Sequence, residues 1–341
     1  MVTNLQLSLP TVLNNMNSLV SEGLLVQVGA DESVVGVGRK PQLITVNQKA
    51  KFTIGVSIQA SQIRIAAVDL KSNIVAKQIR NIVFSNTSEY FTQVLMFVYR
   101  FIQLSEIEFT NVLGIGIAVP GIIDQENMTI ISSRELGIEN EHIEKSFKKA
   151  LFPVWLENDA IASGRYIQEQ YSDSGNLLFL SVGMHIKSAL FIDGEPYTGN
   201  NNRGIDLAHV CLVPDGKPCY CGRKGCVEQY LSLANISSDF GTELEDFLAE
   251  VAKGGEKYKN AFIEYKKWFS LAISNFYRTY NCNIALGGEN ISLLAPFAAD
   301  FFADAESAAG TDMHLFFDNK PVESSAVGAT LHFITEFIGS V

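Results

Sequence analysis

The chain has 341 residues, a net charge of −11 and 47% hydrophobic residues. This length exceeds what one hydrophobic core normally serves, so we expect two or three domains. The acidic balance argues against an extended nucleic-acid-binding surface, although a small DNA-binding module can lie within an acidic chain. The sequence contains neither an apolar run long enough to span a bilayer nor a secretory signal pattern, so we expect a cytoplasmic protein without a membrane partner.

Residues 1–50 are expected to form a small unit of their own. In LSLPTVLNNMNSLVSEGLL, Ser8 can cap a helix, Pro10 falls in its first turn, and apolar residues recur at helical spacing until Gly23. Two strand-like runs follow, LLVQVG and PQLITVN, joined by a loop rich in Gly, Asp and Ser. A helix followed by a two-stranded ribbon is the second half of a winged helix-turn-helix. The alternative is an ordinary helix with a solvated polar face.

From about residue 51 strands and helices alternate. Strands are expected in FTIGVSI, IRIAAVDL, IVAKQIRNIVF and VLGIGIAVPG, with an apolar-faced helix in SEYFTQVLMFVYRFIQ. The order then recurs with the strands NLLFLSVG, SALFIDG and NIALGG, a helical region over 242–280 and a last helix in SAVGATLHFITEFIG. Two similar α/β halves predict a ligand cleft between them. We place the first α/β domain at 51–160, with the C-terminal helix 324–341 returning to it, and the second at 161–323.

Several motifs, in this order, resemble those of the ROK family of repressors, open reading frames and sugar kinases. They are GRKPQLITVN after the ribbon, GIGIAVPGIID at 114–124, LENDA at 156–160, CYCGRKGCVE at 219–228, and LGGENIS and AVGATL near the end. The Cys-x-Cys-Gly-x-x-Gly-Cys-x-Glu signature downstream of Asn-Asp-Ala is the most specific of them. The resemblance implies an α/β, actin-like, ribonuclease-H-like two-domain fold shared with hexokinases, and it favours an N-terminal winged helix that binds DNA.

The resemblance also implies how DNA would be bound. The family's repressors bind operator DNA as symmetric oligomers, so we expect a homodimer or homotetramer. The DNA contacts are expected from the helix, its cap and the wing, at Ser8, Thr11, Asn14, Asn15, Ser18, Arg39 and Lys40. Family repressors carry a further helix before the segment that matches TNLQLSLPTV, for which Met1 leaves no room, so the winged helix is expected to be truncated or to begin upstream.

Four of the five cysteines lie between residues 211 and 226. Cytosolic thiols stay reduced, so the cluster favours metal ligands over disulfides. Three cysteines at Cys-x-Cys-x4-Cys and a histidine a short loop upstream suit tetrahedral zinc, and a closed set of four ligands predicts a structural role. The family pattern supports this assignment for His209, Cys219, Cys221 and Cys226. We expect Cys211 and Cys282 to be small buried hydrophobic side chains instead.

In ROK proteins an Asn-Asp pair, the Glu and His of a Gly-Glu-x-Gly-His motif, and the Glu after the last cysteine line the sugar pocket. By position these become Asn158, Asp159, Asp206, His209 and Glu228. The Asn-Asp pair also suits a helix N-cap before AIASGRYI, and the two interpretations are compatible. The middle motif has changed to GIDLAH, and the family's Asn-Leu-x-x-Trp has become RELGI. We therefore expect the ligand to be a different sugar, a sugar derivative, or a weakly bound one.

In the family's kinases Asp159 would be the general base that takes a proton from the attacking hydroxyl of the sugar. Both phosphate loops differ here. GVSIQASQI replaces Asp-x-Gly-Gly-Thr, and GMHIK replaces Gly-Thr-Gly-Ile-Gly, so that Gln59, His185 and Lys187 stand where kinases have glycine. These side chains occupy positions where backbone amides approach phosphate, so we expect no ATP binding and a loss of kinase activity.

The sequence thus favours a sugar-responsive transcriptional regulator, a repressor, with a sugar in the interdomain cleft and operator DNA on the winged helix. A ligand changes DNA affinity only through its preference for one conformation, so the cleft should differ between the bound and free states. Two alternatives stay open. One is an ATP-dependent hexose kinase with Asp159 as general base, and the other is a sugar-binding protein that does not bind DNA.

Overall fold

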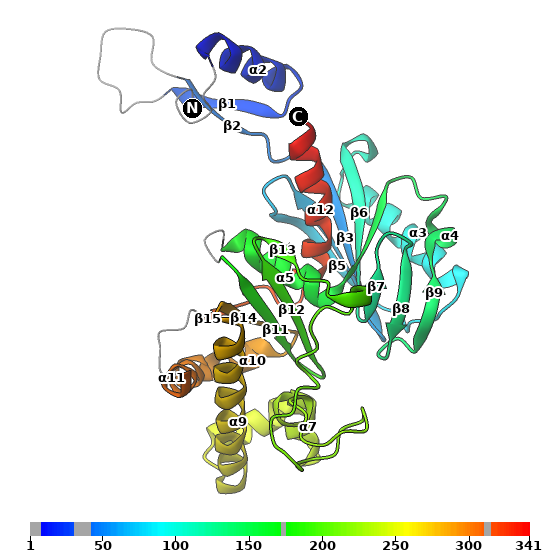
Figure 1. Ribbon diagram of the computed structural model, residues 1–341. Coiled ribbons are helices and arrows are strands. Elements are labelled where there is room, and N and C mark those ends of the chain that lie inside the picture. Colours follow the sequence, from blue (N-terminus) through cyan, green and yellow to red (C-terminus); the bar gives the residue numbers. More distant parts are fainter. Residues whose placement is uncertain (1–7, 31–41, 172–174, 310–314) are drawn as a thin grey trace, which may run out of the picture.

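The computed structural model describes residues 8–30, 42–171, 175–309 and 315–341. A small N-terminal unit stands beside a larger body built on two five-stranded sheets (Figure 1). The last helix, α12 (Ser324–Ser340), runs from between these sheets to the N-terminal unit. Within the described ranges, no helix combines the length and apolar character that a membrane crossing requires.

The N-terminal unit contains the predicted helix and ribbon. The Ser8 hydroxyl accepts a hydrogen bond from the backbone N–H of Thr11 at 3.3 Å, and Pro10 lies in the first turn. Gly23, with φ of 75°, follows the helix end, where glycine tolerates a left-handed backbone. The elements are α2 (Leu9–Ser21) and the antiparallel strands β1 (Leu25–Ala30) and β2 (Gln42–Val46). The expected wing, with Arg39 and Lys40, lies outside the described residues.

The first large sheet has the strand order β10-β6-β3-β4-β5. Strands β3, β4 and β6 are buried almost throughout, whereas β5 alternates between partly buried and exposed residues as an edge strand does. The strands of this sheet are β3 (Phe52–Ile58), β4 (Gln62–Asp69), β5 (Ile74–Asn81), β6 (Val112–Val119) and β10 (Val154–Asn158). The connections contain α3 (Ser88–Leu104), η1 (Phe109–Asn111), α4 (Glu144–Phe147) and a small sheet of β7 (Ile122–Asp124), β8 (Thr129–Ser133) and β9 (Ile138–His142).

The second large sheet repeats this arrangement with the order β13-β12-β11-β14-β15. In both sheets the first three strands in sequence are antiparallel neighbours, and two parallel strands follow on the other side. The strands are β11 (Leu177–Val182), β12 (Ile186–Ile192), β13 (Glu195–Pro196), β14 (Asn283–Gly287) and β15 (Leu315–Phe317). The two similar halves expected from the sequence are therefore present, although the exact domain limits stay predictions.

The remaining helices complete the second half. They are α5 (Asp159–Gln170), η2 (Asn200–Asn202), α6 (Glu228–Leu231), α7 (Leu233–Ser238), α8 (Leu244–Ala252), α9 (Glu256–Tyr280), α10 (Ile291–Leu294), η3 (Ala295–Phe297) and α11 (Ala298–Ala309). The long helix α9 buries an aromatic-rich face in the core that also includes Leu178, Leu180 and Phe301. This core is separate from the one beneath α3 in the first half.

Helices α5 and α12 pack against each other between the two large sheets. Glycines make this close packing possible. A Cβ atom at Gly55 or Gly116 would overlap the backbone of α12, and one at Gly328 would overlap the carbonyl group of Ala162 in α5. The backbone of α12 therefore lies directly on the first sheet and on α5, so this helix contacts both halves.

Replacing Gly328 by alanine should lower the free energy of unfolding by about 2 kcal/mol, because the added methyl group has no room beside Ala162. Gly339→Ala is the matched control in the same helix, since nothing lies within 4 Å of the added atom. We expect the control to leave stability unchanged or to raise it by about 0.5 kcal/mol. Urea unfolding of the three proteins measures both effects, and equal midpoints for the two variants would contradict the packing described here.

Candidate ligand cavity and metal centre

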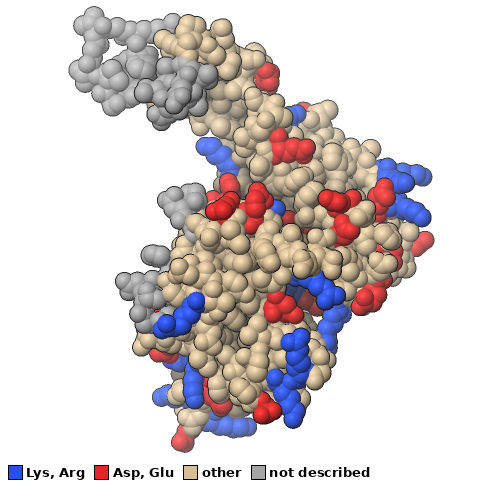
Figure 2. All heavy atoms as spheres, viewed as in Figure 1, with Lys and Arg blue, Asp and Glu red and all other residues tan. Residues whose placement is uncertain are grey.

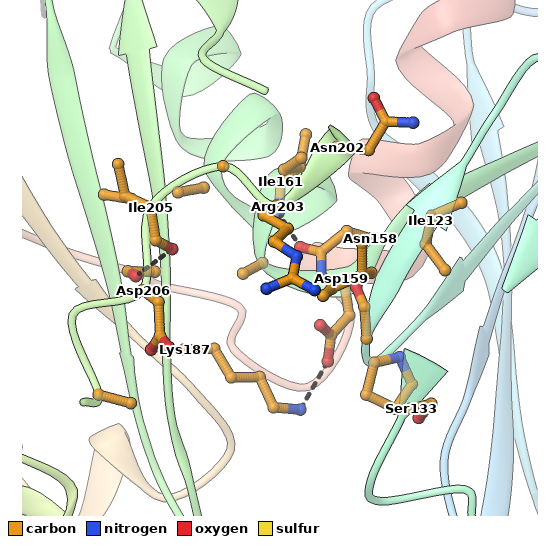
Figure 3. A pocket seen from close by; sticks show the side chains of 18 of the residues that line it. Ile123, Ser133, Asn158, Asp159, Ile161, Lys187, Asn202, Arg203, Ile205 and Asp206 are labelled. Atoms are coloured by element: carbon orange, nitrogen blue, oxygen red, sulfur yellow. Dashed lines mark hydrogen bonds and ion pairs between the residues drawn. The ribbon is translucent and has the colours of Figure 1, made fainter. Parts of the chain in front are cut away.

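A cavity of about 330 Å³ lies between the two halves. This volume is at the lower end of those that hold small ligands. Its wall comes from the loops after β6 and β8, the first turn of α5, strand β12 and the segment 197–209. Figure 3 shows Asn158, Asp159, Lys187, Arg203 and Asp206 around it. Four of the five predicted sugar-binding residues, Asn158, Asp159, Asp206 and His209, line this one cavity.

Asn158 joins strand β10 to helix α5. Its Oδ1 accepts a hydrogen bond from the N–H of Ile161 at 2.9 Å, and its Nδ2 donates one to the carbonyl oxygen of Gly121 at 2.7 Å. The predicted helix N-cap is thus confirmed, and the side chain also fixes the loop after β6. Asp159, the next residue, begins α5 and lies at the cavity wall.

Lys187 of β12 links the two halves across the cavity. Its ammonium lies 2.7 Å from Oδ2 of Asp159 and 2.8 Å from Oε1 of Glu135, which follows β8. Burial works to lower the pKa of Lys187, but the two carboxylates outweigh it and hold that pKa above its ordinary value. Lys187 is therefore charged at neutral pH. The sequence showed that a lysine replaces a loop glycine but did not indicate these partners.

The second oxygen of Asp159 lacks a partner. Oδ1 is buried and accepts no hydrogen bond from any described residue. An unsatisfied buried acceptor destabilises a protein by about 1–3 kcal/mol, so a donor supplied by a ligand would be stabilising here. Asp206 offers a further carboxylate at the same cavity.

Glu228, the fifth predicted sugar-binding residue, lies behind the cavity wall. It is 2% exposed, and its Oε2 accepts the backbone N–H of Ile186 at 2.8 Å. Its Oε1 lies 2.7 Å from Nδ1 of His185, which does line the cavity. This hydrogen bond raises the pKa of His185 despite partial burial. In this structure Glu228 therefore reaches the cavity through His185, one of the side chains that replace the loop glycines.

A second polar contact between the halves lies away from this cavity. Glu289, in the LGGENIS segment after β14, accepts a hydrogen bond from the side chain of Gln59. The guanidinium of Arg64 in β4 also lies 2.6 Å from the same carboxylate. Gln59 is the residue that the family resemblance places where the kinases have a phosphate-loop glycine. Its side chain is thus engaged with the opposite half of the protein.

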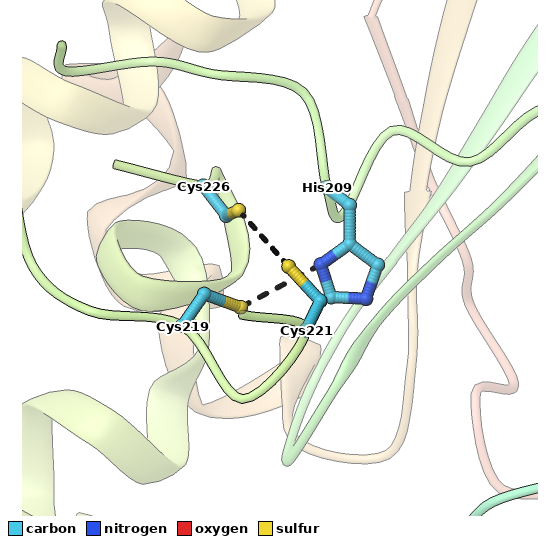
Figure 4. Close-up of side chains that lie close together, drawn as sticks. All are labelled: His209, Cys219, Cys221 and Cys226. Atoms are coloured by element: carbon cyan, nitrogen blue, oxygen red, sulfur yellow. Dashed lines mark hydrogen bonds between the residues drawn. The ribbon is translucent and has the colours of Figure 1, made fainter. Parts of the chain in front are cut away.

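The four predicted metal ligands form one cluster (Figure 4). The ligand atoms of His209, Cys219, Cys221 and Cys226 all lie within 4.8 Å of one another. The sulfur of Cys219 is 3.6 Å from Nδ1 of His209, and the sulfurs of Cys221 and Cys226 are 3.6 Å apart. Zinc–sulfur bonds of about 2.3 Å in a tetrahedron place ligand atoms roughly 3.7 Å apart. The cluster therefore fits a tetrahedral zinc ion.

The two remaining cysteines differ in their surroundings. Cys282 is buried, as the sequence predicted, and burial raises the pKa of its thiol to about 11. Cys211 is exposed, so its prediction as a buried hydrophobic side chain was wrong. The apolar run HVCLV suggested burial, but this segment belongs to a loop and not to a strand of the core. An apolar run without helical or strand periodicity does not indicate which of its residues face solvent.

The metal cluster is joined to the cavity by Tyr220, which lies between two of the cysteine ligands. Its ring meets the ring of His209 edge-on, with centroids 5.1 Å apart, and the guanidinium of Arg134 lies 3.5 Å above its centre. Tyr220, His209 and Arg134 all line the cavity. The knuckle that would hold a metal ion therefore also forms part of the cavity wall, a role that the ligand spacing alone did not reveal.

The described DNA-binding candidates Ser8, Thr11, Asn14, Asn15 and Ser18 are all exposed on or beside α2. The Ser8 hydroxyl also contacts that of Thr11 at 2.8 Å, and Ser18 donates a hydrogen bond to Glu22 at 2.9 Å. The visible face of the described part of this unit carries few charged side chains (Figure 2). The described candidates therefore give α2 an exposed surface of hydroxyl and amide groups, with the carboxylate of Glu22 beside Ser18.

Comparison with known proteins gives consistent results. The model of the ROK family matches residues 53–299. The xylose repressor of Bacillus subtilis (strain 168) is 24% identical over 280 residues, which are 80% of this chain and 72% of that protein. The DNA-binding transcriptional dual regulator NagC of Escherichia coli (strain K12) is 22% identical over 235 residues, covering 68% and 57%.

Two solved structures illustrate the fold. A ROK family transcriptional regulator, described as a homolog of the E. coli MLC protein, superposes with a TM-score of 0.79 at 18% identity, over 98% of this chain and 90% of that one. A ROK hexokinase from Thermus thermophilus superposes with a TM-score of 0.71 at 19% identity, over 85% and 100%. These likenesses confirm the actin-like fold of the sugar kinases that the motifs implied. The chain belongs to the ROK family.

Proposed function

We propose that this protein is a sugar-responsive transcriptional repressor, with a monosaccharide in the cavity and operator DNA on the unit formed by α2, β1 and β2. The observation that carries the proposal is the ion pair between Lys187 and Asp159 at 2.7 Å. This ion pair leaves the cavity polar, which suits the hydroxyl groups of a sugar. It also occupies the carboxylate that a kinase would use as its general base. The similarity to repressors and to the regulator NagC supports the same function.

The ion pair is unfavourable for phosphoryl transfer. The ammonium of Lys187 occupies Oδ2 of Asp159, so that oxygen is not available to take a proton from a sugar hydroxyl. Transfer from ATP also needs a cradle of backbone amides, and His185, Lys187 and Gln59 place side chains at the positions where the kinases have glycine. The contact of Gln59 and Arg64 with Glu289 further joins the halves on the side of LGGENIS, which resembles the adenosine-side motif of the kinases.

The chemistry of the cavity favours a small neutral sugar. Asp159 Oδ1 and the carboxylate of Asp206 can each accept a hydrogen bond from a sugar hydroxyl. In the family's kinases the reacting hydroxyl lies beside the residue equivalent to Asp159, and here Lys187 stands there. Because the Lys187 side chain takes up space beside Asp159, the cavity favours a sugar that has no hydroxymethyl group next to Asp159. D-xylose, the sugar in the names of several relatives, is therefore the first ligand to test.

Helix α12 provides a mechanical route from the cavity to the DNA-binding unit. It packs on α5, whose first turn carries Asp159, and its last residues border a groove shared with the N-terminal unit. Ser340 and Val341 line a groove together with Val12, Met16 and Ile44 of the N-terminal unit. A sugar that changes the angle between the halves would move this helix, and with it the spacing of paired units in a dimer or tetramer on two operator half-sites.

We further propose that zinc occupies the cluster of His209 and three cysteines in a structural role. When bound there, the ion supplies rigidity to the loop rather than chemistry, since four protein ligands leave no open position. His209 and Tyr220 would then hold their places in the cavity wall. The metal would thus contribute to sugar affinity without contacting the sugar.

The DNA-binding proposal predicts that the purified protein binds the DNA upstream of its own gene and that D-xylose releases it. Fluorescence anisotropy of labelled DNA, with D-glucose and L-arabinose as comparison sugars, measures both steps. Binding should weaken steeply with added salt because phosphate contacts release counterions. Absence of binding at low salt, with and without sugars, would contradict the proposal. Phosphorylation of a hexose from ATP that disappears in Asp159→Asn would support the kinase instead.

Replacing Lys187 by methionine should weaken sugar binding about tenfold, because Asp159 and Glu135 would repel each other without the ammonium. Lys217→Met is the matched control. Lys217 pairs with Asp239 at 2.9 Å on the surface, where such pairs contribute about 0–1 kcal/mol and no cavity residue is involved. Calorimetric titration with D-xylose compares the two variants with the natural protein. An unchanged dissociation constant in Lys187→Met would refute the role given to this residue.

The zinc proposal predicts that Cys221→Ser loses the metal, whereas Cys211→Ser retains it. Both cysteines are exposed in the same region, so the variants differ mainly in whether a ligand is removed. Elemental analysis of the purified proteins gives the zinc content, and thermal unfolding should show a lower midpoint for Cys221→Ser because metal binding stabilises the folded state. Equal zinc content in the two variants would show that the ligand set is wrong.

A further inference from the structure

Cys211 lies directly opposite the metal-ligand candidate Cys226 across a short antiparallel bridge. The flanking hydrogen bonds run from the N–H of Val227 to the carbonyl of Val210 at 2.9 Å and from the N–H of Leu212 to the carbonyl of Gly225 at 2.7 Å. These bonds join the neighbours of the cysteines rather than the cysteines themselves. The two cysteines therefore form a non-hydrogen-bonded pair.

This type of pair brings two side chains close together on the same face. In non-hydrogen-bonded pairs the Cα atoms are about 4.5 Å apart, and a disulfide spans Cα separations of about 4.4–6.8 Å. The backbone at Cys211 and Cys226 is thus already placed for a disulfide, and rotation about the Cα–Cβ bonds is the motion that remains.

The two thiols differ in their surroundings. Cys211 is exposed and is not one of the four clustered ligands, whereas Cys226 is 1% exposed and is one of them. A free, accessible thiol thus stands beside a thiol on which the metal centre depends. We propose that Cys211 and Cys226 form a reversible disulfide that disassembles the metal centre, so that the knuckle is an oxidation-sensitive switch.

The chemistry balances with hydrogen peroxide as oxidant. The thiolate of Cys211 attacks one peroxide oxygen, the O–O bond breaks, hydroxide leaves, and Cys211 becomes a sulfenic acid. The thiolate of Cys226 then attacks the sulfur of Cys211, the S–S bond forms, the S–O bond breaks, and a second hydroxide leaves. The two sulfurs together lose two electrons, the peroxide gains them, and both hydroxides take protons from solvent to give water.

The position of Cys211 explains why it would react first. The other cysteines of the region are metal-ligand candidates, and coordination would make their sulfurs less reactive toward peroxide than the free thiol of Cys211. Cys282, the fifth cysteine, is buried. Once Cys226 has joined the disulfide, His209, Cys219 and Cys221 remain as ligands, and a site with three ligands holds zinc less tightly. The ion is therefore released.

The switch would also act on the cavity, and this consequence rests on the proposed function. Tyr220 lies between two of the cysteine ligands and contacts Arg134 and His209 at the cavity wall. Release of the metal frees this loop, so oxidation would weaken the response to sugar. Formation of the disulfide itself depends on neither sugar nor DNA.

Zinc-loaded protein treated with hydrogen peroxide tests the proposal. A chromogenic chelator follows zinc release, and acid quenching with thiol alkylation traps the products. Digestion before aspartate and after arginine or lysine separates the cysteines into peptides 206–214, 215–223 and 225–238, with Cys211 in the first and Cys226 in the last. We expect a disulfide-linked pair of 206–214 and 225–238 that appears with zinc release and disappears on reduction, after which added zinc binds again.

Two variants make the test decisive. Cys211→Ser, at an exposed position, should keep its zinc at peroxide concentrations that empty the natural protein, whereas Cys282→Ser should release zinc as the natural protein does. Equal release from Cys211→Ser would overturn the proposal. So would a linkage between 215–223 and 225–238, or oxidation of Cys211 with zinc retained. Because no sugar or DNA is present, failure here is distinguishable from failure of the repressor proposal.

Discussion

The ammonium of Lys187, held between Asp159 and Glu135, is the interaction on which the rest of the cavity depends. Two carboxylates from the first half and the start of α5 face one cavity, and without a cation between them they would repel each other. The lysine comes from β12, in the second large sheet, so the same contact joins the two halves. Lys187 is thereby part of the wall of the ligand cavity.

The cavity wall and the metal cluster form one structural unit. His209 belongs to both, and Tyr220 extends from the cysteine loop to Arg134. Glu228, two residues after Cys226, supports His185 from behind. The signature that the family shares with its kinases is therefore used here to fix side chains around a cavity. The close packing of α12 against α5 and the first sheet connects that cavity with the N-terminal unit.

Much of this could be predicted because it depends on local sequence. The Ser8 cap, the strands, the Asn158 cap and the ligand spacing of the cysteines are set within a few residues. The partners of Lys187 could not be predicted, since Glu135 and Asp159 reach it through the tertiary fold. The prediction that Cys211 is buried was wrong for the same reason. A hydrophobic run does not indicate which of its residues the tertiary fold leaves exposed to solvent.

Hydrogen–deuterium exchange of the full chain, with and without a saturating concentration of a sugar that it binds, shows whether the cavity and the N-terminal unit are coupled. A ligand held by Asp159 and Asp206 should slow exchange at the first turn of α5 and in β12. It should also alter exchange in α12 and α2, which border one groove and lie on the proposed route to DNA. We expect coupled changes at all four elements, weakened together in Lys187→Met. Protection confined to a surface site away from β12 and α5, with α12 and α2 unchanged, would contradict it.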